Sequence, residues 1–214
     1  MKFLYGFLLV VAGISLYVFI DNRNQSNMTF RQKLIRTFYP VLERISGKKV
    51  QENKAVVQPP QSIYDITITL TDGQLVKLDS FRGKKILIVN TASGCGYTPQ
   101  YEKLEALFRQ HHDSLVVLAF PSNDFKQQEP GTDADIAAFC KKNFGVSFPI
   151  AQKGSVKKGL HQQVLYRWLT DPSQNGWNER APDWNFCKYL ISENGVLLRV
   201  MNAGVTGKAL IDAP

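Results

Sequence analysis

An apolar run that ends in a cysteine-bearing turn is the feature that most restricts how this chain can fold. Residues 86–89 read Ile-Leu-Ile-Val, which is typical of a buried strand. Thr98 and Pro99 follow and predict a helix start, with Thr98 as N-cap and Pro99 in the first helical position. Cys95 therefore lies in a strand-to-helix turn, where the helix dipole would stabilise a thiolate. A reactive cysteine and a small buried thiol in a tight turn both fit this position.

Strand and helix patterns alternate along the rest of the chain. Alternating apolar residues around a Thr-Asp-Gly turn predict a hairpin at 66–78. We expect strands at 85–91, 115–120, 186–191 and 196–201, and helices at 99–112, 133–143 and 161–169. Strands that alternate with helices indicate an α/β domain, and the final antiparallel pair makes its sheet mixed. The predicted fold is a central mixed β-sheet flanked by helices, in a domain that starts near residue 62.

The first residues form a second long apolar run. Residues 3–20 carry no charge and would span roughly 27 Å as a helix, close to the thickness of a bilayer core. A cleaved signal peptide is the alternative, but bulky residues run straight into Asp21, which favours an uncleaved anchor. We therefore predict a single-pass protein anchored in a bacterial inner membrane through residues 3–20. Basic residues on both sides of the run leave open which side of the membrane carries the domain.

A basic segment connects the apolar run to the domain. Residues 28–46 have apolar positions at helical spacing with basic residues between them, and Pro40 interrupts them. This helix could lie in a membrane interface or pack on the domain, and residues 47–61 have the composition of a linker. The net charge is +8, and no zinc-finger or RNA-binding motif accompanies it, so no nucleic-acid partner is expected. The expected organisation is an anchor at 1–22, a basic amphipathic segment and linker at 23–61, and a catalytic domain at 62–214.

The cysteine count excludes a disulfide scaffold. The three cysteines are Cys95, Cys140 and Cys187, an odd and sparse set. None of them belongs to a pair or cluster with the spacing of a zinc site. No structural metal is expected.

Four separate motifs, one of which contains Cys95, together match the pattern of a known family. They are residues 90–98, 120–131, 143–149 and 184–190, and in order and spacing they resemble the glutathione peroxidase family. The resemblance covers about residues 62–202. It implies a thioredoxin-like fold and a peroxidase that reduces hydrogen peroxide and organic or lipid hydroperoxides. It implies no cofactor, only a thiol reductant as co-substrate.

The resemblance also implies the site residues. The catalytic tetrad of the family corresponds to Cys95, Gln128, Trp184 and Asn185. The two side-chain amides and the indole N–H are hydrogen-bond donors, which would favour the thiolate of Cys95 and stabilise charge as the peroxide O–O bond breaks. Cys95 would then become a sulfenic acid.

The route back to the thiol is the next prediction. Cys140 lies where two-cysteine members of the family carry their resolving cysteine, which implies a Cys95–Cys140 disulfide and recycling by thioredoxin. A glutathione-dependent one-cysteine cycle, a peroxide sensor that relays oxidation to a partner protein, and a non-catalytic binding domain are the alternatives. We expect a structural role for Cys187. The short segment at 170–183 implies a monomer and an open site.

Overall fold

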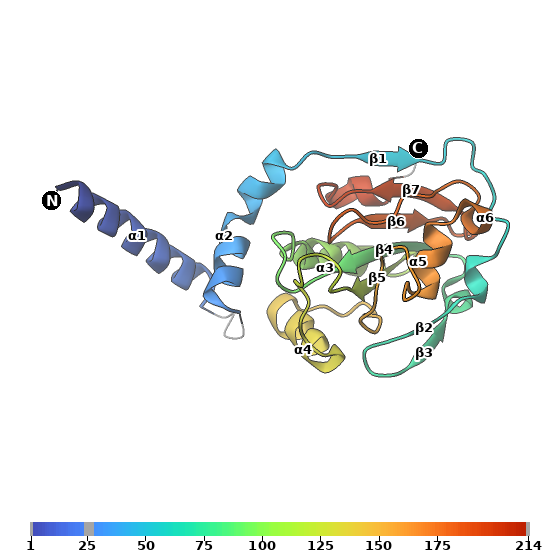
Figure 1. Ribbon diagram of the computed structural model, residues 1–214, viewed down its shortest axis with the longest axis horizontal. Helices are drawn as coiled ribbons and strands as arrows, with labels where there is room; N and C mark the ends of the chain where they lie inside the picture. Colours follow the sequence, from blue (N-terminus) through green and yellow to red (C-terminus); the bar gives the residue numbers. More distant parts are fainter. Residues whose placement is uncertain (1, 24–27, 213–214) are drawn as a thin grey trace.

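A five-stranded mixed sheet forms the centre of the molecule in this computed structural model, with strand order β1-β7-β6-β4-β5 (Figure 1). The structure describes residues 2–23 and 28–212, with the side chains of the first helix described from Val10 onward. Residues 1, 24–27 and 213–214, which the expected organisation includes, lie outside the described residues. The helices are α1 (Lys2–Asp21), α2 (Phe30–Ile45), α3 (Gln100–Gln110), α4 (Asp133–Phe144), α5 (Val164–Leu169) and α6 (Pro172–Asn175). The strands are β1 (Val50–Glu52), β2 (Thr67–Thr69), β3 (Leu75–Lys77), β4 (Lys85–Thr91), β5 (Leu115–Pro121), β6 (Lys188–Ile191) and β7 (Leu197–Met201).

The central strand β4 pairs in parallel with β5 and antiparallel with β6. Ile88 is opposite Leu118 on one side and Tyr189 on the other. The predicted α/β domain with a central mixed sheet is therefore confirmed. The predicted hairpin is also present, as β2 and β3 pair in a small separate sheet.

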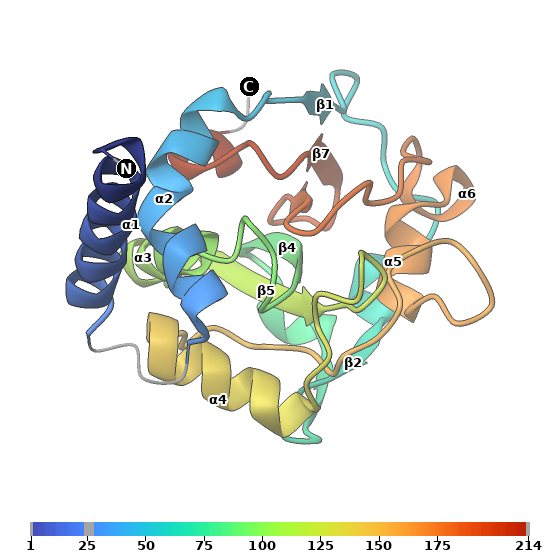
Figure 2. The ribbon, with the colours of Figure 1, turned by 60° about the vertical axis from the view of Figure 1, so that its left-hand side comes forward.

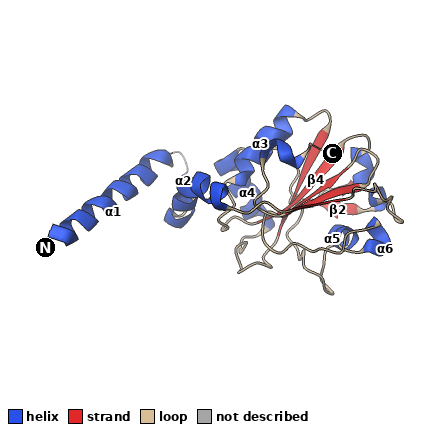
Figure 3. Ribbon diagram, turned by 90° about the horizontal axis from the view of Figure 1, so that it is seen from above, coloured by secondary structure: helices blue, strands red, loops and turns tan. Residues whose placement is uncertain are grey.

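Successive residues of β4 point to opposite faces of the sheet and enter two different hydrophobic cores. Leu87 and Val89 pack with residues of α3 and α4, while Ile86 and Ile88 pack with residues of α5. Figure 3 shows α3 and α5 on opposite sides of the strands. Because both faces are covered, the strand is apolar at successive positions rather than at every second one. This burial fixes the sheet and hence the position of the turn that follows β4.

Strand β6 carries a lysine that is completely buried. The ammonium group of Lys188 donates hydrogen bonds to Gln100 Oε1 of α3, to the Ala203 carbonyl at 3.1 Å and to the Val205 carbonyl at 2.9 Å. Burial lowers the pKa of Lys188 to about 7. The side chain therefore joins the first turn of α3 to the loop after β7.

Lys188→Met is expected to lower the free energy of unfolding by about 2 kcal/mol, because it leaves buried acceptors without a donor. Urea unfolding of the full chain measures this change. The matched control is Lys85→Met, since the Lys85 ammonium is only part-buried and donates to the single Ile211 carbonyl at 3.2 Å. Equal, small losses in both variants would contradict a structural role for Lys188.

Several element boundaries differ from the sequence-based expectation. Helix α3 begins at Gln100, with Pro99 at the N-cap position and no side-chain cap, so Thr98 is not the N-cap. Helix α5 begins at Val164 rather than at 161, and β6 begins at Lys188 rather than at 186. In the segment expected to be a linker, β1 pairs antiparallel with β7 and forms an edge of the sheet.

The predicted transmembrane helix is wrong. Among the residues that the structure describes, no helix combines the length and the apolar character that a membrane crossing requires. The membrane contact through residues 3–20 and the single-pass location in a bacterial inner membrane are therefore wrong as well.

Helix α2 packs on the domain, which is one of the two possibilities for the amphipathic segment. It begins with a capping box between Thr29 and Gln32, and it passes in front of α3 with α1 on its outer side (Figure 2). Arg36 forms an ion pair with Glu102 of α3 at 2.8 Å. Ser46, which follows α2, is 2.9 Å from the Tyr97 hydroxyl. Helix α2 thus lies against the turn that carries Cys95.

Candidate functional site

The turn after β4 is held in shape by the side chain of Thr98. Its hydroxyl accepts a hydrogen bond from the Cys95 N–H at 3.1 Å and lies 2.7 Å from the Ala92 carbonyl, to which it donates. The Tyr97 N–H points at Cys95 Sγ from 3.5 Å. Cys95 is buried, with 1% of its surface exposed. The thiol therefore lies within a network of turn N–H groups just before α3.

Two side chains from the loop before β6 reach the same sulfur. The side-chain donors of Asn185 and Trp184 lie near enough to the Cys95 thiol to lower its pKa. Asn185 Nδ2 also donates to Gln128 Oε1 at 3.0 Å. The structure thus brings together Cys95, Gln128, Trp184 and Asn185, from three separate parts of the chain. Their catalytic roles remain a prediction.

The pKa of Cys95 reflects two opposing causes. Burial raises the pKa of the thiol, and hydrogen bonds from the Tyr97 N–H, Asn185, Trp184 and the Gly96 N–H lower it. Burial is the larger cause, and the net shift is upward. The sequence led us to expect stabilisation of the thiolate, because it shows the donors but not the depth at which the sulfur is buried. In this arrangement the sulfur is held as a thiol.

Asn90 is a positioning residue that the sequence analysis missed. It is fully buried at the end of β4, and its Nδ2 donates to the Trp184 carbonyl at 2.9 Å. Its Oδ1 accepts from the Cys187 N–H at 3.0 Å. Phe186, between these partners, has a φ of 64°, which is rare for a residue with a large side chain. The polar Asn90 directly after the apolar residues of β4 could have indicated a special role. Its hydrogen-bond partners, however, lie far away in sequence and could not be predicted.

Glu129 fixes the other side of the turn. Its carboxylate accepts from the Ser93 N–H at 2.9 Å and from the Ser93 hydroxyl at 2.6 Å. Next to this contact, the Gly94 N–H donates to the Gln128 carbonyl at 2.9 Å. A Cβ on Gly94 would lie only 3.0 Å from that carbonyl oxygen, so this close approach requires glycine. Burial raises the pKa of Glu129 to about 7, although the Ser93 donors lower it.

Replacing Glu129 by glutamine tests this contact through its pH dependence. Since the pKa of Glu129 is raised on folding, the native state holds a proton that the unfolded state releases, and wild-type stability falls as pH rises from about 4.5 to about 7. Glu129→Gln removes this titration. We expect the wild-type free energy of unfolding to fall by about 3 kcal/mol relative to the variant across this pH window.

Chemical denaturation at a series of pH values measures the difference between the two proteins. Below the window and above it, the difference in free energy of unfolding between the two proteins should not change with pH. The two proteins need not be equally stable there, because glutamine accepts only part of the Ser93 hydrogen bonding. Parallel stability curves across the whole window would show that Glu129 does not titrate there.

The other two cysteines are buried on either side of the site. Cys140 lies in α4 with no exposed surface, and burial raises its pKa to about 12. Cys187 is 3% exposed, and its thiol donates to Asp183 Oδ1 at 3.2 Å. Burial raises the pKa of Cys187 to about 11. All three cysteines are free thiols in this structure.

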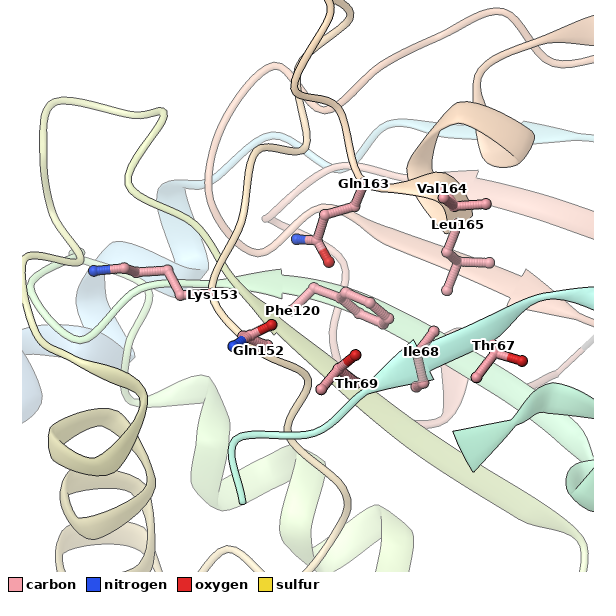
Figure 4. A pocket seen from close by; sticks show the side chains of 9 residues that line it. All are labelled: Thr67, Ile68, Thr69, Phe120, Gln152, Lys153, Gln163, Val164 and Leu165. Carbon is pink, nitrogen blue, oxygen red and sulfur yellow. The ribbon is translucent and has the colours of Figure 1, made fainter. Parts of the chain in front are cut away.

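A separate pocket of about 190 Å³ lies between β2, the end of β5 and the start of α5 (Figure 4). Phe120, Gln152 and Gln163 are among its lining residues, and none of the predicted site residues lines it. Across residues 2–23 and 28–212, no group of three His, Cys, Asp or Glu side chains is placed to hold a metal ion. The chemistry-bearing residues instead gather around Cys95.

Comparison with known proteins finds one family repeatedly. A family model described as glutathione peroxidase matches residues 63–170. The glutathione peroxidase homolog BsaA of Staphylococcus aureus is 43% identical over 140 residues, which cover 65% of this chain and 87% of that protein. The glutathione peroxidase-like peroxiredoxin 2 of Saccharomyces cerevisiae is 40% identical over 139 residues, which cover 64% of this chain and 85% of that protein.

Solved structures support the fold. The crystal structure of Trgpx in its apo form has a TM-score of 0.52 at 30% identity, covering 72% of this chain and 97% of that one. A DsbF homologue from Corynebacterium diphtheriae has a TM-score of 0.54 at 14% identity, covering 78% of this chain and 92% of that one. The second likeness concerns the fold alone. Together they support a thioredoxin-like α/β fold.

Proposed function

We propose, on the premise that this chain belongs to the glutathione peroxidase family, that it reduces hydroperoxides at Cys95 with the help of Gln128, Trp184 and Asn185. The protein is a thiol peroxidase, and its electrons come from a thiol co-substrate rather than from a prosthetic cofactor. We assign this activity to residues 62–214, with residues 23–61 as a basic extension before the domain. We further propose that the protein acts as a monomer on hydrogen peroxide and on organic or lipid hydroperoxides.

One observation carries this proposal. The side-chain donors of Asn185 and Trp184 lie near enough to the Cys95 thiol to lower its pKa, and Asn185 Nδ2 also donates to Gln128 Oε1 at 3.0 Å. Asn185 Oδ1 is buried and accepts no hydrogen bond within the described part of the chain. The site thus offers donors for a developing negative charge and one free acceptor for a hydrogen bond from the substrate. A cysteine with a purely structural role would need none of these groups.

The first step transfers two electrons from sulfur to the peroxide. Cys95 sulfur attacks the terminal peroxide oxygen, so an S–O bond forms while the O–O bond breaks. The leaving oxygen takes up the thiol proton and departs as water or an alcohol. Cys95 becomes a sulfenic acid, and the peroxide is reduced. The amide and indole donors stabilise the charge on the leaving oxygen.

Cys140 is the proposed resolving thiol. Its sulfur attacks the Cys95 sulfenic acid, the hydroxyl leaves as water, and a disulfide forms. A dithiol reductant of the thioredoxin type then reduces the disulfide and becomes oxidised itself. Cys140 is fully buried in α4, so the proposal includes a local opening of α4 before the thiol reaches the sulfenic acid and thioredoxin reaches the disulfide.

The burial of Cys140 favours one alternative. A thiol with no exposed surface and a pKa of about 12 is unreactive while α4 stays folded. In that case a glutathione thiol would attack the sulfenic acid directly, in a one-cysteine cycle.

One experiment separates the two cycles. The reduced protein is treated with one equivalent of hydrogen peroxide, and its cysteines are mapped by mass spectrometry. The two-cysteine cycle predicts a Cys95–Cys140 disulfide that thioredoxin reduces. A stable sulfenic acid on Cys95 beside a free Cys140, with turnover supported by glutathione alone, would establish the one-cysteine cycle. An unmodified Cys95 would refute the proposed function itself.

A further inference from the structure

The segment that precedes the domain closes over Cys95. Met28 is only 6% exposed and belongs to the same hydrophobic core as Cys95, Phe139 and Phe144. A cavity of about 10 Å³ lies beside the thiol, with Met28, Gln32 and Ile35 on one side and Cys95, Phe139 and Phe144 on the other. A cavity of about 10 Å³ holds at most about one water molecule, so the thiol has almost no free space beside it.

This wall lies outside the part of the chain that matches the family. The family match begins at residue 63, whereas Met28, Gln32 and Ile35 come from the basic extension. In Figure 2, α2 crosses in front of the domain next to α3. The site is therefore a catalytic turn from the domain covered by a helix from the extension.

The buried side chains of Met28 and Tyr39 and several polar contacts at the surface hold the α2 part of the extension in place. Gln32 Nε2 donates to the Ser93 carbonyl at 3.0 Å, and Arg36 pairs with Glu102 at 2.8 Å. Both members of this ion pair are partly exposed, and such pairs contribute little to stability. A Cβ on Gly96 would lie 3.3 Å from Leu42, so α2 also approaches the turn closely. Helix α2 can therefore lift from the turn together with Met28 while the remaining residues of both hydrophobic cores stay packed.

We propose that Met28, Gln32 and Ile35 determine which hydroperoxides reach Cys95. While α2 stays packed on the turn, hydrogen peroxide can reach the thiol after a small movement of the wall side chains. A bulky organic hydroperoxide reaches it only when α2 lifts away from the turn. The proposal rests on the proposed function for its substrates, but the access to Cys95 that it describes can be measured without any peroxide. Burial by this wall also raises the pKa of Cys95, so lifting the extension should make the thiol more acidic.

The first measurement is the alkylation of Cys95 in the full chain by iodoacetamide and by the bulkier N-phenylmaleimide, followed by mass spectrometry. Met28→Ala should raise the maleimide rate by about tenfold and the iodoacetamide rate by less. The pH profile of alkylation should move to lower pH. Met28→Leu refills the space and should restore the wild-type ratio of the two rates.

The second measurement compares peroxides. The ratio of kcat/KM for cumene hydroperoxide to that for hydrogen peroxide should rise by about tenfold in Met28→Ala. Glu102→Ala combined with Ser46→Ala removes the ion pair with Arg36 and the contact with Tyr97 but leaves every side chain that lines the cavity in place, and it should shift both measurements in the same direction. Arg82→Ala breaks an exposed ion pair with Asp79 away from this site and should change neither.

Alkylation of Cys140 and Cys187 reports whether a variant has unfolded, because both thiols are buried. If the ratio of the two alkylation rates at Cys95 stays at the wild-type value in Met28→Ala and in the Glu102/Ser46 double variant, the wall does not control access and the proposal is refuted. If Met28→Ala also exposes Cys140 and Cys187, the double variant alone decides. Absence of peroxidase activity in the wild-type protein would refute the proposed function, while the alkylation rates would still test access to Cys95.

Discussion

Replacing Cys95 by serine is expected to lower the rate of peroxide consumption by more than about a thousandfold. Serine has nearly the same size, so the hydrogen bonds of the turn should persist. Its hydroxyl, however, is a poor nucleophile toward a peroxide oxygen and cannot cycle through a sulfenic acid. Hydrogen peroxide consumption by the purified full chain, with thioredoxin or with glutathione as reductant, measures the effect.

Cys187→Ser is the matched control for this variant. Cys187 is also buried, and a serine hydroxyl there can still donate to Asp183, as the thiol does at 3.2 Å. Peroxide consumption by this control should stay within about twofold of wild type. Retention of most activity in Cys95→Ser would show that another group reacts with the peroxide, and equal losses in both variants would indicate damage to the fold.

Cys140→Ser is expected to separate the first turnover from the later ones. The first peroxide molecule should react with Cys95 at the wild-type rate, because Cys140 takes no part in that step. Steady-state turnover with thioredoxin should fall by about a hundredfold, since the sulfenic acid then lacks its intramolecular partner. Stopped-flow measurement of the first turnover, followed by a steady-state assay, gives both quantities on one sample.

The burial of Cys140 adds a second readout to this prediction. The N–H of Val146 bonds the Cys140 carbonyl at 3.3 Å, and Gly145 ends α4 with a φ of 64°. Formation of the disulfide must break this helix end, so peroxide should increase amide hydrogen exchange at residues 139–146 in wild type but not in Cys140→Ser. Undiminished thioredoxin turnover in Cys140→Ser would rule out the resolving role.

Those parts of the fold whose signal is local could be predicted from the sequence. The predicted strand at 85–91 coincides with β4. A strand that is buried on both faces has consecutive apolar residues, and this local pattern is visible in the sequence. Helix α4 was expected at 133–143 and spans Asp133–Phe144, with Thr132 and Asp135 as its capping box. The family motifs, rather than any periodicity, were what singled out Gln128, Trp184 and Asn185.

The contacts that depend on distant partners could not be predicted. Ser93 and Glu129 are 36 positions apart, and nothing in either neighbourhood predicts that they bond. Lys188 is a charged residue in a strand, and its burial depends on acceptors in α3 and in the loop after β7. The apolar run at 3–20 suggested a membrane helix because its composition shows only that the residues are apolar and not what they contact. The residue that follows α1 contacts α2, since Asn22 Nδ2 donates a hydrogen bond to Thr37 Oγ1 at 2.9 Å.

Strand β1 has a consequence for how copies of the protein meet one another. It occupies the outer edge of β7, where Val50 is opposite Met201 and Glu52 is opposite Arg199. Asn53 extends the cover by donating to the Leu197 carbonyl at 3.1 Å. A protein trimmed to residues 62–214 would lose this cover and present a row of unpaired N–H and C=O groups along β7. Such an edge is a template for adding a strand from another molecule, so the extension also protects the sheet from aggregation.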